Sequence, residues 1–508
     1  MNDAEKLTKE NEELRKLVAD QERELKVSGQ KIQTLEEYIR SLKHKQFGSS
    51  SEKSDAQAEL FNEAEQDSEA EEVDTTEDIE VPAHKRKKKK RVSIPKNYPR
   101  QEIIHDLSDE EKVCPHDGAA LKAIGEDTHE QLDIVPVKIH VIRHVHKKYA
   151  CPCCKQYIVT AKKPKQPIEK SIAAPGLLAY ISVNKYCDGL PLYRQVEVLK
   201  RSGIELDRTS MANWMIKCGD LVQALINRIQ DTLLEQPFLH MDETPVQVLK
   251  EEDKAAQSKS YMWVMSSKGG SSPAVLFNYS PSRSGEVPKT LLGDFSGALM
   301  VDGYEGYQSV CNENSIIRLG CWAHARRKFV EAQRNQPKGK SGKADMALSF
   351  IQKLYAVEKL SKGQSSEERY RLRQEKSKPL LDKLKKWLDK TLLNTPPKSS
   401  LGKALSYLSN QWPRLIRYVD DGLWPLDNNA AENSIRPFVI GRKNWLFSAS
   451  VDGAKASANL YSLIETAKAN NLNVYDYLKH VFTMLPQAES FEDIDKLLPW
   501  TVGAEFRY

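Results

Sequence analysis

Two aspartates each follow a short apolar segment, at the point where a side chain leaves a sheet and can meet a metal ion. Asp242 comes after Phe238-Leu-His-Met241, and Asp302 comes after Gly297-Ala-Leu-Met-Val301. Both segments have the apolar content of buried strands. A carboxylate is unfavourable to bury alone, but its hard oxygen atoms suit Mg²⁺. Either aspartate by itself is typical of a strand-end turn, whereas two in matching contexts predict a metal site.

A third carboxylate is expected beyond a long basic insertion, residues 335–424, whose Lys- and Arg-rich segments predict helices. The pair Asn428-Asn429 can cap a following helix, and the first turns of that helix present Glu432 and Arg436 on one face. Glu465 is a second candidate, in an apolar segment farther along the chain. The residues alone leave the choice between the two glutamates open.

Three carboxylates of this kind can hold two divalent ions about 4 Å apart. Such a pair activates a nucleophile and stabilises the leaving oxygen when a phosphodiester is displaced in line. The predicted chemistry is therefore phosphodiester cleavage with two Mg²⁺ or Mn²⁺ ions, and the nucleophile is water or a DNA 3′-hydroxyl.

A sheet flanked by helices is needed to bring these carboxylates together. From residue 236 onward, short apolar segments predict strands, and a helix follows the last of them. Three strands, then one strand, then a strand with a helix is the order of an RNase H-like α/β fold. The segments are Phe238–Met241 with Val246–Leu249, Tyr261–Ser266, Ala274–Tyr279, Gly297–Val301, Ser315–Leu319 and the helix Ala323–Phe329.

Helices are predicted upstream of the sheet, in residues 171–225. Helices at Tyr193–Arg201 and from Arg208 to Cys218 are separated by a glycine-containing turn, and Asp207 is a plausible N-cap. This pattern is typical of a helix-turn-helix, which would place Arg208 and Asn213 in the DNA major groove. An ordinary helical hairpin has the same pattern, so both interpretations stand.

A small β-rich module precedes these helices, with an alternating apolar segment over 135–145 that predicts a strand. Two cysteine-containing knuckles about 35 residues apart predict a structural zinc ribbon. The expected ligands are Cys114, His116, Cys151 and Cys154. The first knuckle has Asp117 where a second cysteine is expected, so Asp117 is an alternative ligand and loss of the site is the other possibility.

The N-terminal segment follows a heptad pattern that predicts a coiled coil and hence a homodimer or higher oligomer. Nine of its twelve core positions are apolar, and Asn11 is a residue that can set the register. A helix docked on its own chain is the alternative. The a positions are Ala4, Asn11, Val18, Leu25, Ile32 and Ile39, and the d positions are Leu7, Leu14, Gln21, Ser28, Leu35 and Leu42.

Charge is distributed very unevenly over the 508 residues. Residues 52–80 contain 13 acidic residues and one basic residue, so with a net charge of +5 the remainder carries +17. Composition predicts a disordered linker over 48–98, with seven consecutive cations at Lys85–Arg91. Such a basic remainder suits a polyanion, and nucleic acid is the first candidate.

No segment has about 18 consecutive apolar residues, and the N-terminus lacks the apolar core of a secretory signal. A cytoplasmic, reducing setting without a membrane partner is therefore expected. The scattered cysteines Cys187, Cys218, Cys311 and Cys321 are interpreted as buried free thiols.

Several of these segments together resemble the insertion sequence 66 family of bacterial transposases, over nearly the whole chain. The resemblance implies that Asp242, Asp302 and Glu432 are the catalytic residues, which favours Glu432 over Glu465. The first zinc knuckle departs from the family pattern of two cysteines. The matching motifs are His240-Met-Asp242-Glu243-Thr244-Pro245, Asp302-Gly303-Tyr304, Cys321-Trp322-Ala-His324-Ala-Arg326-Arg327, Asn428-Asn429-Ala-Ala431-Glu432, Ile435-Arg436-Pro437, Gly441-Arg442-Lys443-Asn444, Tyr461–Ala467 and Leu498-Pro499-Trp500.

Other residues near these motifs have two interpretations each. His324, three residues after Cys321, is either an active-site support or a structural histidine. Trp322 and Trp445 can stack on a displaced base but are more typical of core packing. The cations that can bind phosphates are Arg326, Arg327, Arg436, Arg442 and Lys443.

The family resemblance implies a DNA transposase that cleaves and joins the ends of a mobile element at the nucleoid. Its partners would be element-end DNA, target DNA and small accessory proteins encoded by the same element. The alternatives are a metal-dependent nuclease without strand joining and a catalytically inactive DNA-binding regulator. The expected fold class is a multidomain α+β chain. Its expected domains are the coiled coil 1–47, linker 48–98, zinc-ribbon-like module 99–165, helix-turn-helix region 166–232, RNase H-like α/β catalytic domain 233–450 with its insertion, and a helical C-terminal region 451–508.

Overall fold

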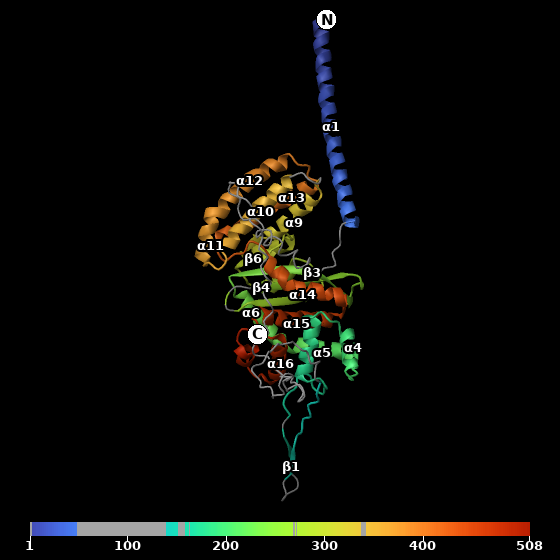
Figure 1. Ribbon diagram of the computed structural model, residues 1–508, viewed down its shortest axis with the longest axis vertical. Helices are drawn as coiled ribbons and strands as arrows, with labels where there is room; N and C mark the ends of the chain where they lie inside the picture. Colours follow the sequence, from blue (N-terminus) through green and yellow to red (C-terminus); the bar gives the residue numbers. More distant parts are fainter. Residues whose placement is uncertain are drawn as a thin grey trace, which may run out of the picture. The chain divides into compact units, whose positions relative to one another are not determined.

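The computed structural model of the chain describes residues 3–47, 139–150, 158–161, 163–267, 270, 272–336 and 342–507 (Figure 1). The chain divides into two units, Met1–Val73 with Lys162–Tyr508, and Asp74–Ala161. Within the described residues, helices and a mixed sheet make an α/β fold. No helix in these ranges combines the length and apolar content needed to cross a membrane.

The smaller unit contains a short antiparallel pair, β1 (Lys148–Ala150) and β2 (Ile158–Thr160), with Tyr149 opposite Val159. The strand predicted over 135–145 is not formed in its described part: residues 139–147 have no regular structure. Val141 and Val145 are 92% and 75% exposed. Alternating apolar residues form a strand only where a partner and a covering layer are available. The predicted zinc ligands Cys114, His116, Cys151 and Cys154, and Asp117, lie outside the described residues.

The N-terminal segment forms one continuous helix, α1 (Asp3–Phe47), as the heptad pattern predicts. The described apolar residues of its core positions are exposed rather than covered. These residues, exposed by between 45% and 72%, are Leu14, Val18, Leu25, Ile32, Leu35, Ile39 and Leu42. An apolar stripe of this length on one chain is a surface that a second helix can cover.

A mixed sheet that includes β3, β4 and β6 forms the centre of the larger unit (Figure 1). Its strand order is β5-β4-β3-β6-β7. Neighbours β3, β4 and β5 are antiparallel, whereas β6 and β7 run parallel to β3, and β8 adds to the far end of β3. Every predicted strand segment from 238 onward overlaps a strand, although Gly297, Ser315 and Ile316 lie outside the observed strands. The bounds are β3 Phe238–Lys250, β4 Lys259–Ser267, β5 Ala274–Ser280, β6 Ala298–Val301, β7 Ile317–Gly320 and β8 Ser448–Ser450.

Helix α15 (Val451–Ala469) covers the outer edge of β5 with hydroxyl groups. Thr466 Oγ1 accepts the Val275 N–H at 3.0 Å and donates to the carbonyl oxygen of the same residue at 3.0 Å. Ser462 Oγ accepts the Phe277 N–H at 2.7 Å. An edge strand normally presents unpaired backbone groups to other chains. Here the helix satisfies them internally.

Upstream helices pack against α15 and its neighbour α16. Asp207 caps α5 by accepting the Ser210 N–H at 3.0 Å, as predicted. Gly219 of α5 allows a close approach, since a Cβ there would lie 2.6 Å from the Ala456 Cα. The helices of this layer are α3 Pro175–Tyr186, α4 Leu192–Arg201, α5 Arg208–Leu221, α6 Gln223–Leu234, α16 Val474–Met484 and α17 Phe491–Asp495.

The predicted insertion is helical and has its own apolar core, which includes Leu354, Leu388 and Leu408. Within it, Arg373 pairs with Glu358 at 2.6 Å. The chain then returns to the sheet through α14. The remaining helices are α7 Glu286–Leu292, α8 Gln308–Glu313, α9 Trp322–Arg334, α10 Lys343–Leu360, α11 Ser366–Leu372, α12 Lys378–Leu393, α13 Ser400–Leu415 and α14 Asn429–Trp445.

The hydrogen bonds between the α15 hydroxyl groups and the β5 backbone are expected to stabilise the fold. We expect Thr466→Val, which keeps the shape but removes the hydroxyl, to lower the free energy of unfolding by about 1–3 kcal/mol. Thr466 is fully buried, so the backbone of Val275 is left without this partner. The measurement is urea or thermal unfolding of the full chain. Thr483→Val is the control, because the Thr483 hydroxyl is exposed and bonds only within its own helix. Equal midpoints for the two variants would contradict the role of Thr466.

Candidate active site

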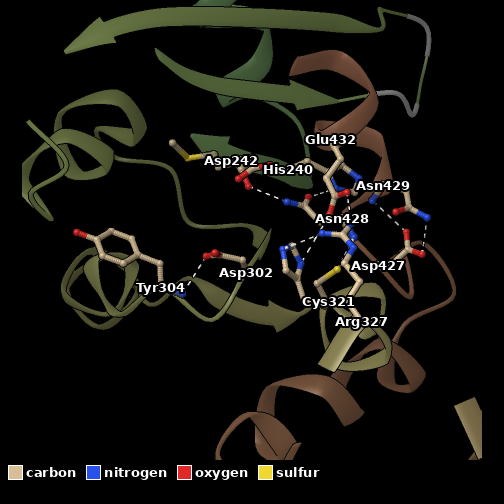
Figure 2. Close-up of polar contacts among 12 residues, drawn as sticks. His240, Asp242, Asp302, Tyr304, Cys321, Arg327, Asp427, Asn428, Asn429 and Glu432 are labelled. Carbon is tan, nitrogen blue, oxygen red and sulfur yellow. Dashed lines mark hydrogen bonds and ion pairs between the residues drawn. The ribbon is translucent and has the colours of Figure 1, made fainter. Parts of the chain in front are cut away.

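Asp242 and Asp302 leave the sheet at the same edge. β6 pairs in parallel with Phe238–His240 of β3, and Asp242 stands two residues beyond this pairing. Asp302 directly follows the last residue of β6. Parallel strands end at one edge, so both carboxylates emerge there (Figure 2). The prediction that Asp242 ends its strand was wrong, because β3 continues to Lys250 through its pairing with β4.

The Asp302 turn is held by an arginine of the next strand. Asp302 Oδ1 accepts the Tyr304 N–H at 2.8 Å. The Arg318 guanidinium donates to the carbonyl oxygens of Asp302 at 3.1 Å and Tyr304 at 2.7 Å, and Arg318 is only 3% exposed. Sequence reasoning missed Arg318. Its one available signal was a lone cation inside an apolar strand.

Glu432 reaches this edge because the end of the insertion is attached to the start of α9. The Trp322 backbone N–H donates to Leu426 O at 3.3 Å, and the Trp322 indole donates to Leu415 O at 2.9 Å. Trp322 is fully buried, so its core interpretation is the correct one. As α9 begins just after β7, these bonds bring the first turn of α14, and with it Glu432, beside the sheet.

Asn428 joins α14 to β3. Its side chain is fully buried, its Oδ1 lies 2.9 Å from His240 Nδ1, and its Nδ2 donates to Met241 O at 2.8 Å. Asn428 is the N-cap residue, but its side chain makes no capping bond. The Asn429 N–H is instead accepted by Asp427 Oδ1 at 3.0 Å. The predicted cap position is confirmed, whereas the predicted use of the asparagine side chain was wrong.

The charges of Asp302 and Glu432 act electrostatically on Asp242. Burial raises the pKa of Asp242 well above its ordinary value, and the negative charges of Glu243, Glu432 and Asp302 raise it further. Glu432 is 2% exposed, and burial raises its pKa while Arg327 opposes the shift. A carboxylate with several negative neighbours is a group that a divalent cation would stabilise.

Glu465, the alternative third carboxylate, lies on α15, away from these charges. It pairs with Lys468 at 2.8 Å. The pKa of Asp242 is raised by Glu432 and not by Glu465. The assignment of Glu432 as the third catalytic carboxylate stays a prediction.

Arg327 and His324 of α9 lie against Glu432. Figure 2 labels Arg327 and Glu432. Arg327 Nη2 donates to Glu432 Oε2, and Arg327 Nη1 lies 3.4 Å from His324 Nε2. Burial, together with the Arg327 charge, lowers the pKa of His324 to about 4. The imidazole is therefore neutral near pH 7. Arg327, predicted as a phosphate ligand, is engaged with the glutamate in this structure.

Glu243 forms a second buried cluster next to Asp242, and sequence reasoning assigned it no role. Its side chain is 2% exposed, and its Oε1 pairs with Arg283 at 2.5 Å. Its Oε2 accepts the Tyr307 hydroxyl at 2.6 Å. Arg283 also stacks on the Tyr304 ring at 4.1 Å. The cluster thus links the residue after Asp242 to the turn that carries Asp302.

The remaining predicted DNA-binding residues differ in how exposed their side chains are. Arg208, Asn213 and Lys443 are exposed, and Arg326 and Arg436 are half-buried. Arg442 is half-buried, and its Nη1 donates to Thr244 Oγ1 at 3.0 Å and to Pro245 O. Arg442 therefore contacts β3 rather than only solvent.

Three comparisons bear on this arrangement. A family model described as Transposase IS66 family matches residues 170–456, more than half of the chain. The chain belongs to the IS66 transposase family. Further IS66 models match on both sides of this segment. They are the zinc-finger binding domain of transposase IS66 at residues 111–155, the Transposase C of IS166 homeodomain at 34–103, and the IS66 C-terminal element at 462–500.

Curated relatives of this IS66 family member come from Sinorhizobium fredii (strain NBRC 101917 / NGR234). Uncharacterized protein y4jD is 33% identical over 427 residues, which cover 81% of this chain and 82% of the relative. Uncharacterized protein y4qI is 34% identical over 404 residues, covering 77% and 74%. No solved structure matches the chain.

The crowding of carboxylates predicts a conflict between stability and function. We expect Asp242→Asn to raise the thermal midpoint of the metal-free protein by about 2–4 °C, the effect of about 1 kcal/mol. The substitution removes a charge that burial and neighbouring carboxylates disfavour. Because the folded pKa of Asp242 is raised, the penalty is absent below the ordinary value of 3.8 and grows as the pH rises.

Thermal unfolding in a chelator between about pH 4 and pH 8 measures this effect. The advantage of the variant is expected to widen toward the higher pH. Added Mg²⁺ is expected to stabilise the unsubstituted protein more than the variant. Asp294→Asn, at an exposed turn before β6, is the control and leaves the midpoint unchanged. A lower midpoint for Asp242→Asn at neutral pH would contradict this view of the site.

Proposed function

We propose that this chain is a DDE transposase, which cleaves DNA at the ends of a mobile element and joins those ends to target DNA. The observation that carries the proposal is that Asp242 and Asp302 leave the neighbouring strands β3 and β6 at one edge of the sheet, where the charge of Glu432 from α14 also raises the pKa of Asp242. They come from two strands and a helix separated by a long insertion. The order β5-β4-β3-β6-β7 also supports an RNase H-like assignment of the core.

Asp242, Asp302 and Glu432 would hold two Mg²⁺ or Mn²⁺ ions, for which their carboxylate oxygens are suitable ligands. When bound, such ions activate the attacking oxygen and stabilise the leaving oxygen of the phosphodiester. The protein positions the ligands through Arg318 at the Asp302 turn and Asn428 at the start of α14. The Arg327 guanidinium lies close enough to Glu432 to reach a phosphate bound at the same site.

DNA binding is proposed for the α4–α5 hairpin and for the cations near the site. Arg208 and Asn213 lie exposed on α5, which suits contacts in the major groove. Lys443 and Arg436 lie on α14, the helix that carries Glu432. The family match adds support for a transposase over a nuclease that cleaves without joining, and over an inactive DNA-binding regulator.

The domain divisions and the structural zinc are also part of the proposal. The zinc-finger family match at 111–155 spans Cys114, His116, Cys151 and Cys154 and supports a bound Zn²⁺ in that module. We propose the coiled coil at 1–47, linker at 48–98, zinc module at 99–165, helix-turn-helix region at 166–232, catalytic domain at 233–450 and C-terminal region at 451–508. Accessory proteins of the same element are further proposed partners.

The function is tested with purified protein, Mg²⁺ and labelled element ends, scored separately for nicking and for joining. We expect Asp302→Ala to reduce cleavage at least about 100-fold, because it removes one of the three carboxylates. Binding to the ends in a gel-shift assay is expected to persist. The matched control is Asp294→Ala, which removes an exposed aspartate eight residues earlier.

Cleavage that survives Asp302→Ala would refute the assignment of this residue. Nicking without any joining by the unsubstituted protein would favour the nuclease alternative. End binding without cleavage, in the presence of Mg²⁺ or Mn²⁺, would favour the inactive regulator.

Self-association through α1 is a separate part of the proposal. We expect Ile32→Asp with Leu35→Asp to shift the chain toward the monomer in light scattering, because charges would enter an apolar seam. Both side chains are exposed on the single helix, by 58% and 60%. Lys16→Glu changes the net charge equally at an outer heptad position and is the control. An unchanged mass for the double variant would show that α1 does not hold the oligomer together.

A further inference from the structure

Three potential metal ligands of different chemistry meet at the start of α9. One ligand atom from each of Cys321, His324 and Glu432 lies within 4.8 Å of the others. Cys321 directly precedes α9, His324 belongs to its first turn, and Glu432 comes from the first turn of α14. The Asn428 N–H donates to Cys321 Sγ at 3.2 Å, so the two helix starts are joined at this point.

Two of these ligand atoms are buried and unsatisfied. His324 Nδ1 and Glu432 Oε1 have no hydrogen-bond partner within the described part of the chain. They lie 3.7 Å apart, too far for a hydrogen bond between them. Ligands about 2.0–2.1 Å from a tetrahedral zinc ion lie about 3.3 Å from each other. The spacing is therefore close to that of two ligands of one ion.

The Glu432 carboxylate divides its two oxygens between different neighbours. Oε2 accepts from Arg327, whereas Oε1 faces His324. The Glu432 side chain is only 3% exposed, so bulk water has little access to Oε1. An unsatisfied buried carboxylate oxygen is unfavourable unless a ligand completes the site.

We propose that Cys321 Sγ, His324 Nδ1 and Glu432 Oε1 form a binding site for a borderline-soft divalent cation, with Zn²⁺ as the fitting ion. Sulfur and imidazole nitrogen suit zinc, whereas Mg²⁺ takes oxygen ligands. The site is distinct from the cysteine knuckles of the N-terminal module, which contain none of these residues. Three protein ligands leave a fourth position for water.

Binding at this site is a simple exchange of protons for metal. The Cys321 thiol releases its proton to solvent as the sulfur–zinc bond forms, and no electron transfer is involved. The neutral His324 binds through Nδ1 with its proton on Nε2, and its 3.4 Å contact with Arg327 is given up. The Asn428 N–H then donates to a thiolate, which strengthens that hydrogen bond.

A consequence for catalysis follows from the shared glutamate, and it rests on the proposed function. Zinc bound through Glu432 Oε1 would hold the carboxylate toward Cys321 and His324, so the same group is less available to the Mg²⁺ site. Micromolar zinc is then an inhibitor of Mg²⁺-dependent cleavage. This inhibition would require no change in the positions of Asp242 and Asp302.

Zinc binding is tested on the full chain by metal analysis after dialysis, and by Co²⁺ absorption as a spectroscopic probe. We expect Cys321→Ser and His324→Ala each to bind one ion fewer than the unsubstituted chain, or to bind it at least about 10–100-fold more weakly. Cys321→Ser is also expected to lose a sulfur-to-cobalt absorption component. Cys311→Ser is the control, since Cys311 is a buried free thiol outside this cluster.

Equal metal content and equal Co²⁺ spectra for Cys321→Ser, His324→Ala and Cys311→Ser would overturn the site. Unfolding midpoints measured without metal identify a variant that fails to fold. If Cys321→Ser fails to fold, His324→Ala provides an independent test. Any zinc held by the N-terminal module is common to every variant and cancels in the comparison.

Inhibition is measured separately, as Mg²⁺-dependent cleavage against zinc concentration, with each variant compared to its own zinc-free rate. We expect Cys321→Ser to need at least about tenfold more zinc for half-inhibition. Absence of cleavage in all zinc-free samples would count against the proposed function and leave the binding result standing. Cleavage that zinc inhibits equally in Cys321→Ser and Cys311→Ser would overturn the inhibitory role.

Discussion

Concentration of negative charge around Asp242 is the constraint on which the arrangement of this candidate site depends. Asp242 is disfavoured as an anion by burial and by three neighbouring negative charges. Near Glu432, the cations Arg327 and Arg436 offset part of the negative charge, and Arg327 pairs directly with the carboxylate. The protein therefore maintains a region whose electrostatics favour an added divalent cation. A stable fold must supply the opposing free energy elsewhere, and the buried sheet and its helical covers provide it.

Positioning these charges requires contacts between segments that are distant in sequence. The side chain of Asn428 reaches across 188 residues to His240, and that of Trp322 reaches across 93 residues to the end of the insertion. Arg318 holds the Asp302 turn from the neighbouring strand. Each contact lies in a buried setting, where an unmade hydrogen bond is costly. The insertion can thus be long and helical without displacing Glu432 from the sheet.

The Glu432 carboxylate is shared between the two metal sites proposed above. Oε2 of Glu432 accepts from Arg327, and the carboxylate also lies beside the Cys321 thiol and the His324 imidazole. Asp242 and Asp302, in contrast, can provide a metal ion only with carboxylate oxygens. Hard and borderline-soft ions would therefore prefer different sides of the same residue. The identity of the neighbours at the start of α9, rather than the carboxylate itself, decides which ion is favoured.

The amino-acid sequence by itself determined the local elements: the apolar strands, the Asp207 cap of α5, the helical insertion and the long α1, since these follow from periodicity and capping. Its motifs also indicated the family, which the comparisons bear out. Only the tertiary structure decided that Asn428 bonds β3, that Arg442 contacts Pro245, and that Asp242 lies inside a strand. It also decided that the alternating residues near Val141 stay outside a strand. Local sequence patterns determine backbone conformation, whereas the partners of a side chain depend on which distant segments pack together. No short stretch of sequence contains the information on that packing.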